Sequence, residues 1–335
     1  MEELMLSFLD EQAGGFYDPT SKGFFLMEGV EGALAESTIA HELVHALEDQ
    51  HYDLETLLLS RKGDSDSAAA LHSVMEGSAL AIQQMWMVDS FTPEQWVEVQ
   101  TASTAQSEGL YSSPEYLWKP TMAAYMAGIQ FLSSADGAGL GLGGIDPTIL
   151  DKAYVNPPTS TEQLLHPELY WGEQRELPRP LELEIQPAAG YRVSFEDSFG
   201  EIGLNVLVDP KRDQQAGGPS PLELARLRFT SKASTGWGAD RLLVFEKLSD
   251  ATAPRVVVLM TRWDDEAEAL EFAGALNGVL PQIQASARAM GHPEHGGASW
   301  RRNGDDVTLV VFEDASKLPE GFEGWVRAKP PVSKE

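Results

Sequence analysis

Residues 37–51 constrain this chain more than any other stretch, because they carry the motif His-Glu-x-x-His inside an unbroken helical pattern. At about 100° per residue, His41 and His45 lie one above the other on a helix, so their imidazoles can share one metal ion. Glu42 leans toward the same ion, where its carboxylate can take a proton from metal-activated water. This spacing is typical of zinc peptidases and predicts a metal site on the helix.

The helical projection also predicts that the two sides of this helix differ. The side of the helix opposite the metal ligands is apolar. We expect it to pack into the core through Ile39, Leu43, Leu47, Leu54, Leu57 and Leu58. The chemical side carries His41, His45, Asp49 and Tyr52. The alternative is a helix with two solvated histidines, which is disfavoured by the length of the pattern and by the strand-like sequence before it.

A zinc peptidase needs a third protein ligand beside an open position for water. His51 has the spacing of the last histidine in the extended metzincin motif, His-Glu-x-x-His-x-x-Gly-x-x-His. In that motif the glycine ends the helix and turns the third ligand back. This chain has Glu48 at that position, a good helix former, so the helix should continue and carry His51 roughly 100° away from the metal face. We therefore interpret His51 as a structural residue.

Glu76 is the preferred third ligand. It lies in a second helical stretch, residues 71–80, which follows the helix-breaking residues 61–66. The length between the two stretches allows the first helix to end and the second to return antiparallel to it. His72 lies one turn before Glu76 on the same face and is the remaining candidate. We expect His72 to support the ligand or to lie at the surface.

The sequence around these residues resembles a group of prokaryotic zinc metallopeptidases of the gluzincin type. The group has the pattern His-Glu-Leu-x-His-Ala-Leu-Gln-Asp-Gln-His-Phe-Asp-Leu and then Glu-Gly-Asp-Ala, and this chain has closely similar stretches at 41–54 and 76–79. The resemblance implies a zincin-like fold and Zn²⁺ bound by His41, His45 and Glu76. It also implies that Glu42 is the general base.

The chain departs from the pattern of this group at Glu48, Tyr52 and Ser78, where the group has Gln, Phe and Asp. The carboxylate missing at position 78 would weaken the support of the metal ligands, and such losses can cost tenfold or more in affinity or activity. Asp49 is retained on the metal side of the helix, so we expect it to orient a histidine ring instead.

A β-hairpin is predicted before the zinc helix. Residues 15–27 form two aromatic-rich runs around a turn that contains Pro, Ser and Gly, and the group has a similar Gly-Phe-Tyr-Asp-Pro stretch. The hairpin has two possible roles. Its edge strand can hold an extended peptide by main-chain pairing, or it can be an ordinary part of the core.

His166 is our candidate for the donor that stabilises the oxyanion of the reaction. It follows the cap residues of a short predicted helix and precedes Pro167, and the group has a similar Ser-Thr-Glu-Gln-x-x-His-Pro-Glu stretch. Peptidases of this type need such a donor near the scissile carbonyl. Tyr154 or Tyr170 can substitute for it. In the alternative interpretation His166 only closes a structural turn.

Composition limits the partners and the location of the protein. The 24 basic and 52 acidic residues give a formal charge of −28, which argues against nucleic acid and anionic membranes as partners. There is no cysteine and no apolar run long enough to span a membrane. Residues 1–9 are too short and too acidic for a signal peptide. We expect an upstream segment to be missing and, if so, a secreted or cell-envelope location; the sequence leaves localisation and oligomeric state open.

The chain of 335 residues is expected to form two domains. A stretch rich in proline and charge, 173–189, predicts a boundary between a mostly helical, zincin-like domain at 1–178 and a smaller α+β domain at 179–335. In the second domain we expect strands at 193–208, 241–248 and 255–263, a helix at 264–290 and a hairpin at 299–312. Asp240 and Arg241 are interpreted as a structural turn and ion pair, His292 and His295 as an exposed loop, and the glycine-rich residues 137–144 as a loop.

These observations favour a zinc-dependent enzyme that hydrolyses peptide bonds in a peptide or protein substrate, with Glu42 as the general base. One alternative is a zincin-fold protein that no longer cleaves and serves as a binding or envelope protein, although the retained Glu42 argues against it. Another is a zinc hydrolase of non-peptide amides, since the motif determines how water is activated and not which substrate it attacks.

Overall fold

The computed structural model describes residues 14–112, 114–135, 145–209 and 227–329, and side chains of all these except 103–112. Helices and sheets are both present, so the fold is α+β as expected. The glycine-rich residues 137–144 lie outside the described part. The chain divides into two compact units, and the main division between Glu176 and Leu177 lies close to the expected boundary. Unit 1 contains the described residues of Met1–Lys62, Ser67–Glu176 and Lys211–Phe229; unit 2 contains those of Gly63–Asp66, Leu177–Pro210 and Thr230–Glu335.

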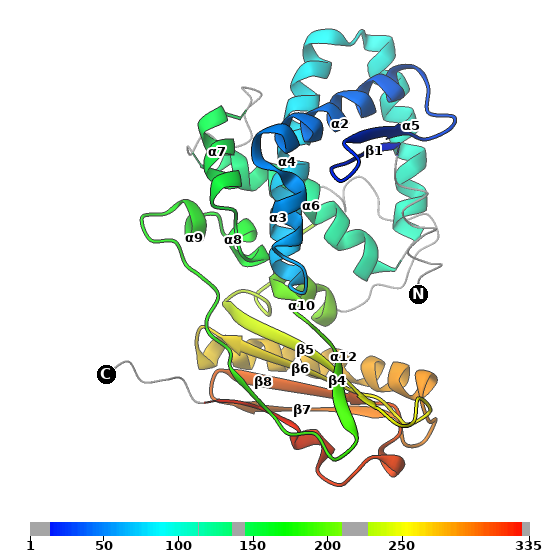
Figure 1. Ribbon diagram of the computed structural model, residues 1–335, viewed down its shortest axis with the longest axis vertical. Coiled ribbons are helices and arrows are strands. Elements are labelled where there is room, and N and C mark those ends of the chain that lie inside the picture. Colours follow the sequence, from blue (N-terminus) through cyan, green and yellow to red (C-terminus); the bar gives the residue numbers. More distant parts are fainter. Residues whose placement is uncertain (1–13, 113, 136–144, 210–226, 330–335) are drawn as a thin grey trace. The chain divides into compact units, whose positions relative to one another are not determined.

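Unit 1 is mostly helical and begins with the predicted hairpin (Figure 1). Strands β1 (Gly15–Asp18) and β2 (Gly23–Leu26) pair antiparallel, with the stacked rings of Phe16 and Phe25 opposite each other. The helices that follow are α2 (Gly32–Tyr52), α3 (Leu54–Leu59), α4 (Ser65–Ser90), α5 (Pro93–Ser112), α6 (Glu115–Ser133), α7 (Pro147–Val155), α8 (Thr161–Leu165) and α9 (Glu168–Trp171).

The predicted orientation of α2 is wrong. Leu43 is 54% exposed and Leu47 62%, whereas the histidines and carboxylates on the other side of the helix are buried. The predicted apolar stripe also breaks at Asp53, whose φ of 55° ends α2. Leu54, Leu57 and Leu58 belong to α3 and do pack into the core as expected. A buried polar face is tolerated here because its groups bind one another, which offsets the cost of removing them from water. The core of unit 1 instead forms around α4 and α6, with Leu71, Val74, Phe131 and Leu132.

Helices α4 and α6 approach each other closely at two glycines. A Cβ atom on Gly77 would lie 2.3 Å from the carbonyl carbon of Gly128, and one on Gly128 would lie 1.9 Å from the carbonyl oxygen of Ser73. Both distances are far below van der Waals contact, so only glycine allows this separation of the two backbones. The contact places residues near Gly128 on α6 beside residues near Gly77 on α4.

Unit 2 is built around an antiparallel sheet with the strand order β4-β5-β6-β8-β7. Helix α12 (Glu266–Met290) covers one face of the sheet, packing through Phe272 and Leu276 against Trp263 and Leu309. The other face packs against the segments around a second, two-stranded sheet, β3-β9, with Trp325 and Val326 in this core. The strands are β3 (Leu183–Ile185), β4 (Tyr191–Asp197), β5 (Trp237–Lys247), β6 (Val256–Trp263), β7 (Gly297–Asn303), β8 (Asp306–Phe312) and β9 (Val326–Ala328).

The predicted helix and hairpin of unit 2 are confirmed, but two other expectations are wrong. The region 193–208 is not one strand, because β4 ends at Asp197 and α10 (Gly200–Val208) follows. Asp240 causes this change, since its buried carboxylate accepts the N–H groups of Phe199 and Gly200 at 2.8 Å and so fixes the start of α10. Asp240 itself lies in β5 and not in a turn, and Arg241 forms an ion pair with Glu196.

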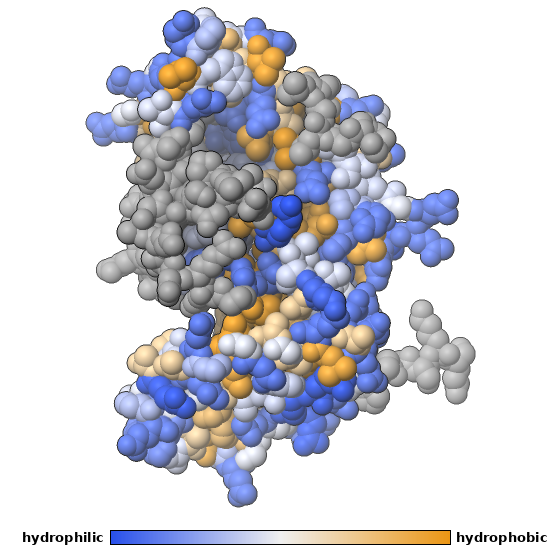
Figure 2. Space-filling view, turned by 180° about the vertical axis from the view of Figure 1, so that it is seen from behind, coloured by the Kyte–Doolittle hydropathy of each residue, from blue (hydrophilic) through white to orange (hydrophobic). Residues whose placement is uncertain are grey.

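Hydrophilic residues cover much of the face shown in Figure 2, with smaller hydrophobic areas between them. Among the helices of the described residues, none combines the length and the apolar character that crossing a bilayer requires.

The glycine contact predicts a large cost for the smallest possible side chain. We expect Gly128→Ala to lower the free energy of unfolding by about 1–3 kcal/mol, because the added methyl group must push α4 and α6 apart. Gly274→Ala is the matched control, since Gly274 lies in α12 and has open space around its Cβ position. Urea denaturation of both variants checks this; equal stability of the Gly128 and Gly274 variants would contradict the role of the contact.

Candidate metal centre

Three predicted ligands meet in unit 1. Helix α2 supplies His41 and His45 one turn apart, and α4 supplies Glu76. The Nε2 atom of His41 lies 3.1 Å from Oε2 of Glu76, and Nε2 of His45 lies 3.8 Å from Oε1 of the same carboxylate. All three residues are buried, and one ligand atom from each lies within 4.8 Å of the others.

The spacing of these atoms fits a single metal ion. A tetrahedral ion with bonds of about 2.1 Å holds its ligand atoms roughly 3.4 Å apart, which is close to the separations found here. The imidazole rings of His41 and His45 are nearly perpendicular, at 86°, with their centres 4.9 Å apart. Two imidazole nitrogens and one carboxylate leave the remaining coordination positions free for water or substrate. The cluster can therefore hold a metal ion.

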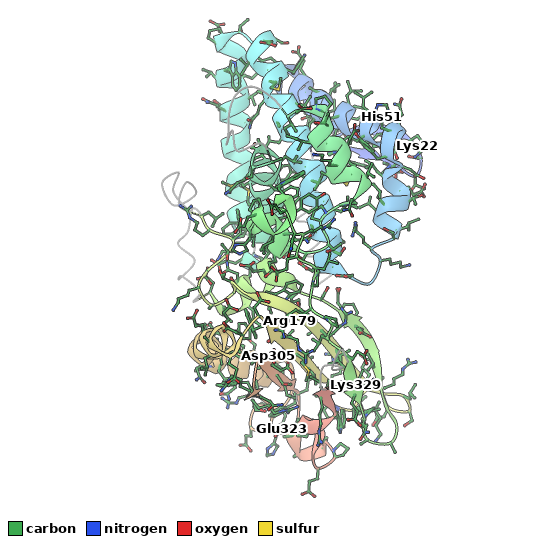
Figure 3. All side chains as sticks on the ribbon, turned by 90° about the vertical axis from the view of Figure 1, so that its left-hand side faces the viewer. Lys22, His51, Arg179, Asp305, Glu323 and Lys329 are labelled. Atoms are coloured by element: carbon green, nitrogen blue, oxygen red, sulfur yellow. The ribbon has the colours of Figure 1, made fainter. Side chains whose placement is uncertain are left out.

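The two other histidines considered as ligands lie outside this group. Helix α2 continues through Glu48 as predicted, and His51 is exposed near its end, in the same region as Lys22 (Figure 3). His72 is half exposed, but its Nε2 atom lies 3.0 Å from Oε1 of Glu76. Although burial opposes ionisation, contacts with His41 and His72 hold the pKa of Glu76 well below its ordinary value. Glu76 is therefore an anionic candidate ligand that His72 contacts from the surface.

Glu42 is buried beside the cluster and is held by the hairpin. The backbone N–H of Tyr17 in β1 donates a hydrogen bond of 2.9 Å to Oε2 of Glu42. Burial raises the pKa of Glu42, and the nearby His45 and His41 offset part of that rise. The hydrogen bond fixes the carboxylate, so that its other oxygen remains to accept a proton.

Asp49 does not orient a histidine ring, contrary to our expectation. Its Oδ2 atom accepts hydrogen bonds from the hydroxyl of Tyr17 at 2.6 Å and from Nζ of Lys22 at 2.8 Å. Its Oδ1 atom accepts the backbone N–H of Leu54 at 3.0 Å. Burial raises the pKa of Asp49, but these bonds outweigh it and leave the pKa below its ordinary value. Asp49 thus holds the hairpin on α2.

The carboxylate that orients His45 comes from Glu48, whereas position 78 carries Ser in place of the Asp of the gluzincin-type group. The Oε2 atom of Glu48 lies 3.3 Å from Nδ1 of His45, the ring nitrogen that does not face the cluster. The hydroxyl of Ser78 donates to the other oxygen of Glu48 and lies 3.4 Å from the hydroxyl of Tyr154. Ser78 therefore does not leave the site without a supporting carboxylate, because Glu48 supplies one. The ring of Tyr52 stacks on Tyr154 at 4.4 Å.

Tyr125 lies beside the cluster and is not among the site residues that the sequence predicted. It projects from α6 one turn before Gly128, and its ring centre lies 6.2 Å from that of His41. Burial, together with the nearby charges of Glu76 and Glu42, raises its pKa well above the ordinary value. Tyr125 is thus a neutral O–H donor beside the cluster. Gly128, three residues later, was the sequence signal that could have indicated a close approach of this helix to another.

The residues predicted for the oxyanion have different surroundings. Tyr170 donates to the backbone carbonyls of Asn156 and Lys152, so it has a structural role. The hydroxyl of Tyr154 lies 3.4 Å from that of Ser78, which bonds to Glu48, the residue that contacts His45. His166 ends α8, with its N–H bonded to the carbonyl of Glu162, and it is not among the grouped ligands. A role of His166 in the reaction stays a prediction.

The other histidine pair of the sequence forms a local turn. His292 and His295 stack with ring centres 4.5 Å apart, and Nδ1 of His292 accepts the N–H groups of Glu294 and His295. His295 is exposed and His292 partly exposed, in agreement with the predicted exposed loop, and their backbones bond to Ala315 and Glu313.

Comparison with known proteins covers mainly unit 2. A family described as Domain of unknown function (DUF8575) matches residues 190–320, which run from the start of β4 to beyond β8. The metal ligands lie outside this match. No curated protein and no solved structure is significantly similar to the chain.

The contact between Glu48 and His45 predicts an effect on metal affinity. We expect Glu48→Gln to weaken binding about tenfold, because the loss of a carboxylate that orients a metal-binding histidine typically costs this much or more. Adding Ser78→Asp to that variant should restore affinity, since a carboxylate returns next to position 48. Competition with a chelator of known affinity measures the effect. Glu55→Gln on α3 is the control, and unchanged affinity in Glu48→Gln would show that this contact does not matter.

Proposed function

We propose that this protein is a zinc-dependent enzyme that hydrolyses peptide bonds, with a zincin-like unit 1 of the gluzincin type. The observation that carries the proposal is the buried group of His41, His45 and Glu76 with the carboxylate of Glu42 beside it. A buried acid and two buried histidines are costly to maintain in a fold unless they have a ligand or a reaction to serve.

The choice of zinc rests on the donor set. Two imidazole nitrogens and one glutamate oxygen are the protein ligands of many catalytic zinc sites, and they leave a position open for water. His45 presents Nε2 to the cluster while Nδ1 faces Glu48, which is the arrangement that fixes a metal-binding ring. Iron(II) sites also use two histidines and one carboxylate, so metal analysis is part of the test below.

The residues around the cluster have distinct roles in the proposed reaction. Zinc, when bound, would polarise the scissile carbonyl and make water acidic enough to attack near neutral pH. Glu42 accepts the proton of the attacking water and passes it to the leaving amine, and the N–H of Tyr17 holds it in place meanwhile. Tyr125 keeps its proton and can donate a hydrogen bond to the oxyanion. Tyr125 is our first candidate for the donor to the oxyanion, and His166 is the second.

Two other functions use the same cluster. A zincin-fold binding or envelope protein would bind the metal without cleaving, but the well-positioned Glu42 has no evident use in such a protein. A zinc hydrolase of non-peptide amides would use the same groups on another substrate. The peptidase is favoured because of the resemblance to gluzincins around both helices.

Metal analysis combined with two variants tests the proposed function. We expect one equivalent of zinc in the purified protein and in Glu42→Gln, and loss of the metal in Glu76→Ala, because Glu76 is a ligand and Glu42 is not. Hydrolysis of a mixed peptide library should occur only with the parent. Elemental analysis and mass spectrometry provide the readouts. Iron instead of zinc, or zinc without cleavage by the parent, would contradict the proposal.

The donor to the oxyanion is tested by a second pair of variants. Tyr125→Phe removes only the hydroxyl, and we expect kcat to fall about a hundredfold with zinc still bound, as found for single oxyanion donors. His166→Ala should lower kcat equally only if His166 is the donor to the oxyanion. Tyr116→Phe is the control, since Tyr116 is an exposed tyrosine of the same helix. An unchanged kcat in Tyr125→Phe would exclude Tyr125.

A further inference from the structure

Unit 2 contains a cavity of about 450 Å³. It lies against the sheet face opposite α12, where β9 and the backbone of residues 324 and 328 border it. The side chains that line it include Met260, Arg301, Asn303, Asp306, Thr308 and Arg327. A volume of this size suits a small organic molecule better than a bare ion.

The strand register explains why polar groups gather there. Met260 of β6, Thr308 of β8 and Arg301 of β7 are direct neighbours across the sheet, so their side chains lie on one face. The next row on the same face includes Asp306 and Asn303. Together these two rows form the sheet side of the cavity.

The acidic groups at this end of the sheet are already neutralised. Asp305 pairs with Arg179 at 2.9 Å, and the labelled side chains of both lie close together in Figure 3. Asp306 accepts two hydrogen bonds from Arg262, at 2.8 and 2.9 Å. Such bidentate pairs satisfy the carboxylate, so Asp306 adds little negative charge to the cavity.

Arg301 and Arg327 have no such partner. Arg301 donates to the backbone carbonyls of Glu323 and Val326, and neither arginine forms an ion pair with any carboxylate that the structure describes. Burial and the charge of Arg327 lower the pKa of Arg301, and the carboxylate of Glu323 offsets part of this fall. The side chain of Glu323 is bound by Ser299. Glu184 lies opposite Arg327 in the β3–β9 pair, so the two arginines have carboxylates near them but form no ion pair with them.

Neutral hydrogen-bonding groups in the cavity are also without partners. Thr308 is only 4% exposed, and its hydroxyl makes no hydrogen bond within the described ranges. The side-chain amide of Asn303 likewise has no partner there. Asn303 is exposed, and both groups line the cavity, so they can bond to a ligand or to water.

We propose that this cavity binds a small organic molecule through an oxyanion, either a carboxylate or a phosphate. Arg327 and the free N–H groups of Arg301 bind the oxyanion, since planar guanidinium groups match both chemistries. Thr308 and Asn303 supply neutral hydrogen bonds, and Met260 contacts the apolar part of the ligand. This site does not depend on the proposed metal chemistry.

Calorimetric titration of the whole protein with citrate and with inorganic phosphate tests the proposal. We expect at least one of the probes to bind saturably, with a Kd of about 1 mM or tighter, in ~0.15 M NaCl that screens weak surface attraction. Arg327→Gln should weaken binding roughly tenfold or more, because a hydrogen bond to a charged group is lost. Thr308→Val keeps the shape of the side chain and should weaken binding severalfold.

Arg288→Gln is the matched control, since Arg288 is exposed on α12, on the other face of the sheet. Binding of citrate alone would identify a carboxylate ligand, and binding of phosphate alone a phosphate ligand; both support the site. Equal weakening in Arg327→Gln and Arg288→Gln would mean unspecific attraction and would overturn the proposal. Absence of saturable binding of both probes at about 10 mM would also overturn it.

Discussion

The backbone contact between Gly77 and Gly128 is the constraint on which the candidate metal centre depends. It allows α4 and α6 to lie closer than any side chain would permit, and Glu76 and Tyr125 flank this contact on the two helices. The hydroxyl of Tyr125 thereby reaches the carboxylate that binds the two histidines of α2. A backbone contact is a rigid means of placing such groups, because helices cannot adapt their separation as flexible side chains can.

The burial of the polar face of α2 follows from the same arrangement. His41, His45 and Glu76 bind one another, Glu48 and Ser78 hold His45 from behind, and the hairpin reaches Glu42 and Asp49 through Tyr17 and Lys22. Each buried charge thus has a partner, which makes its removal from water tolerable. Tyr17 is central to this network because its N–H and its hydroxyl bind different carboxylates of α2, Glu42 and Asp49.

Unit 2 has its own core and its own unmatched polar groups. Its sheet is covered by α12 on one face, and on the other face by segments that border an open cavity with two arginines that form no ion pair. The family match at 190–320 covers most residues that line this cavity and none of the metal ligands. The two sites therefore belong to separate units, and each can be tested without the other.

The sequence by itself determined the local chemistry: helical periodicity and fixed spacing placed His41, Glu42 and His45 together, and a second helical stretch indicated Glu76. It also predicted the hairpins at both ends of the chain and the long helix α12, because turn residues and apolar periods are local signals. Only the tertiary structure decided which face of α2 is buried, that Glu48 replaces the carboxylate absent at 78, and that Tyr125 joins the site. Periodicity shows that two faces of a helix differ, but which face is covered depends on partners far away in the sequence.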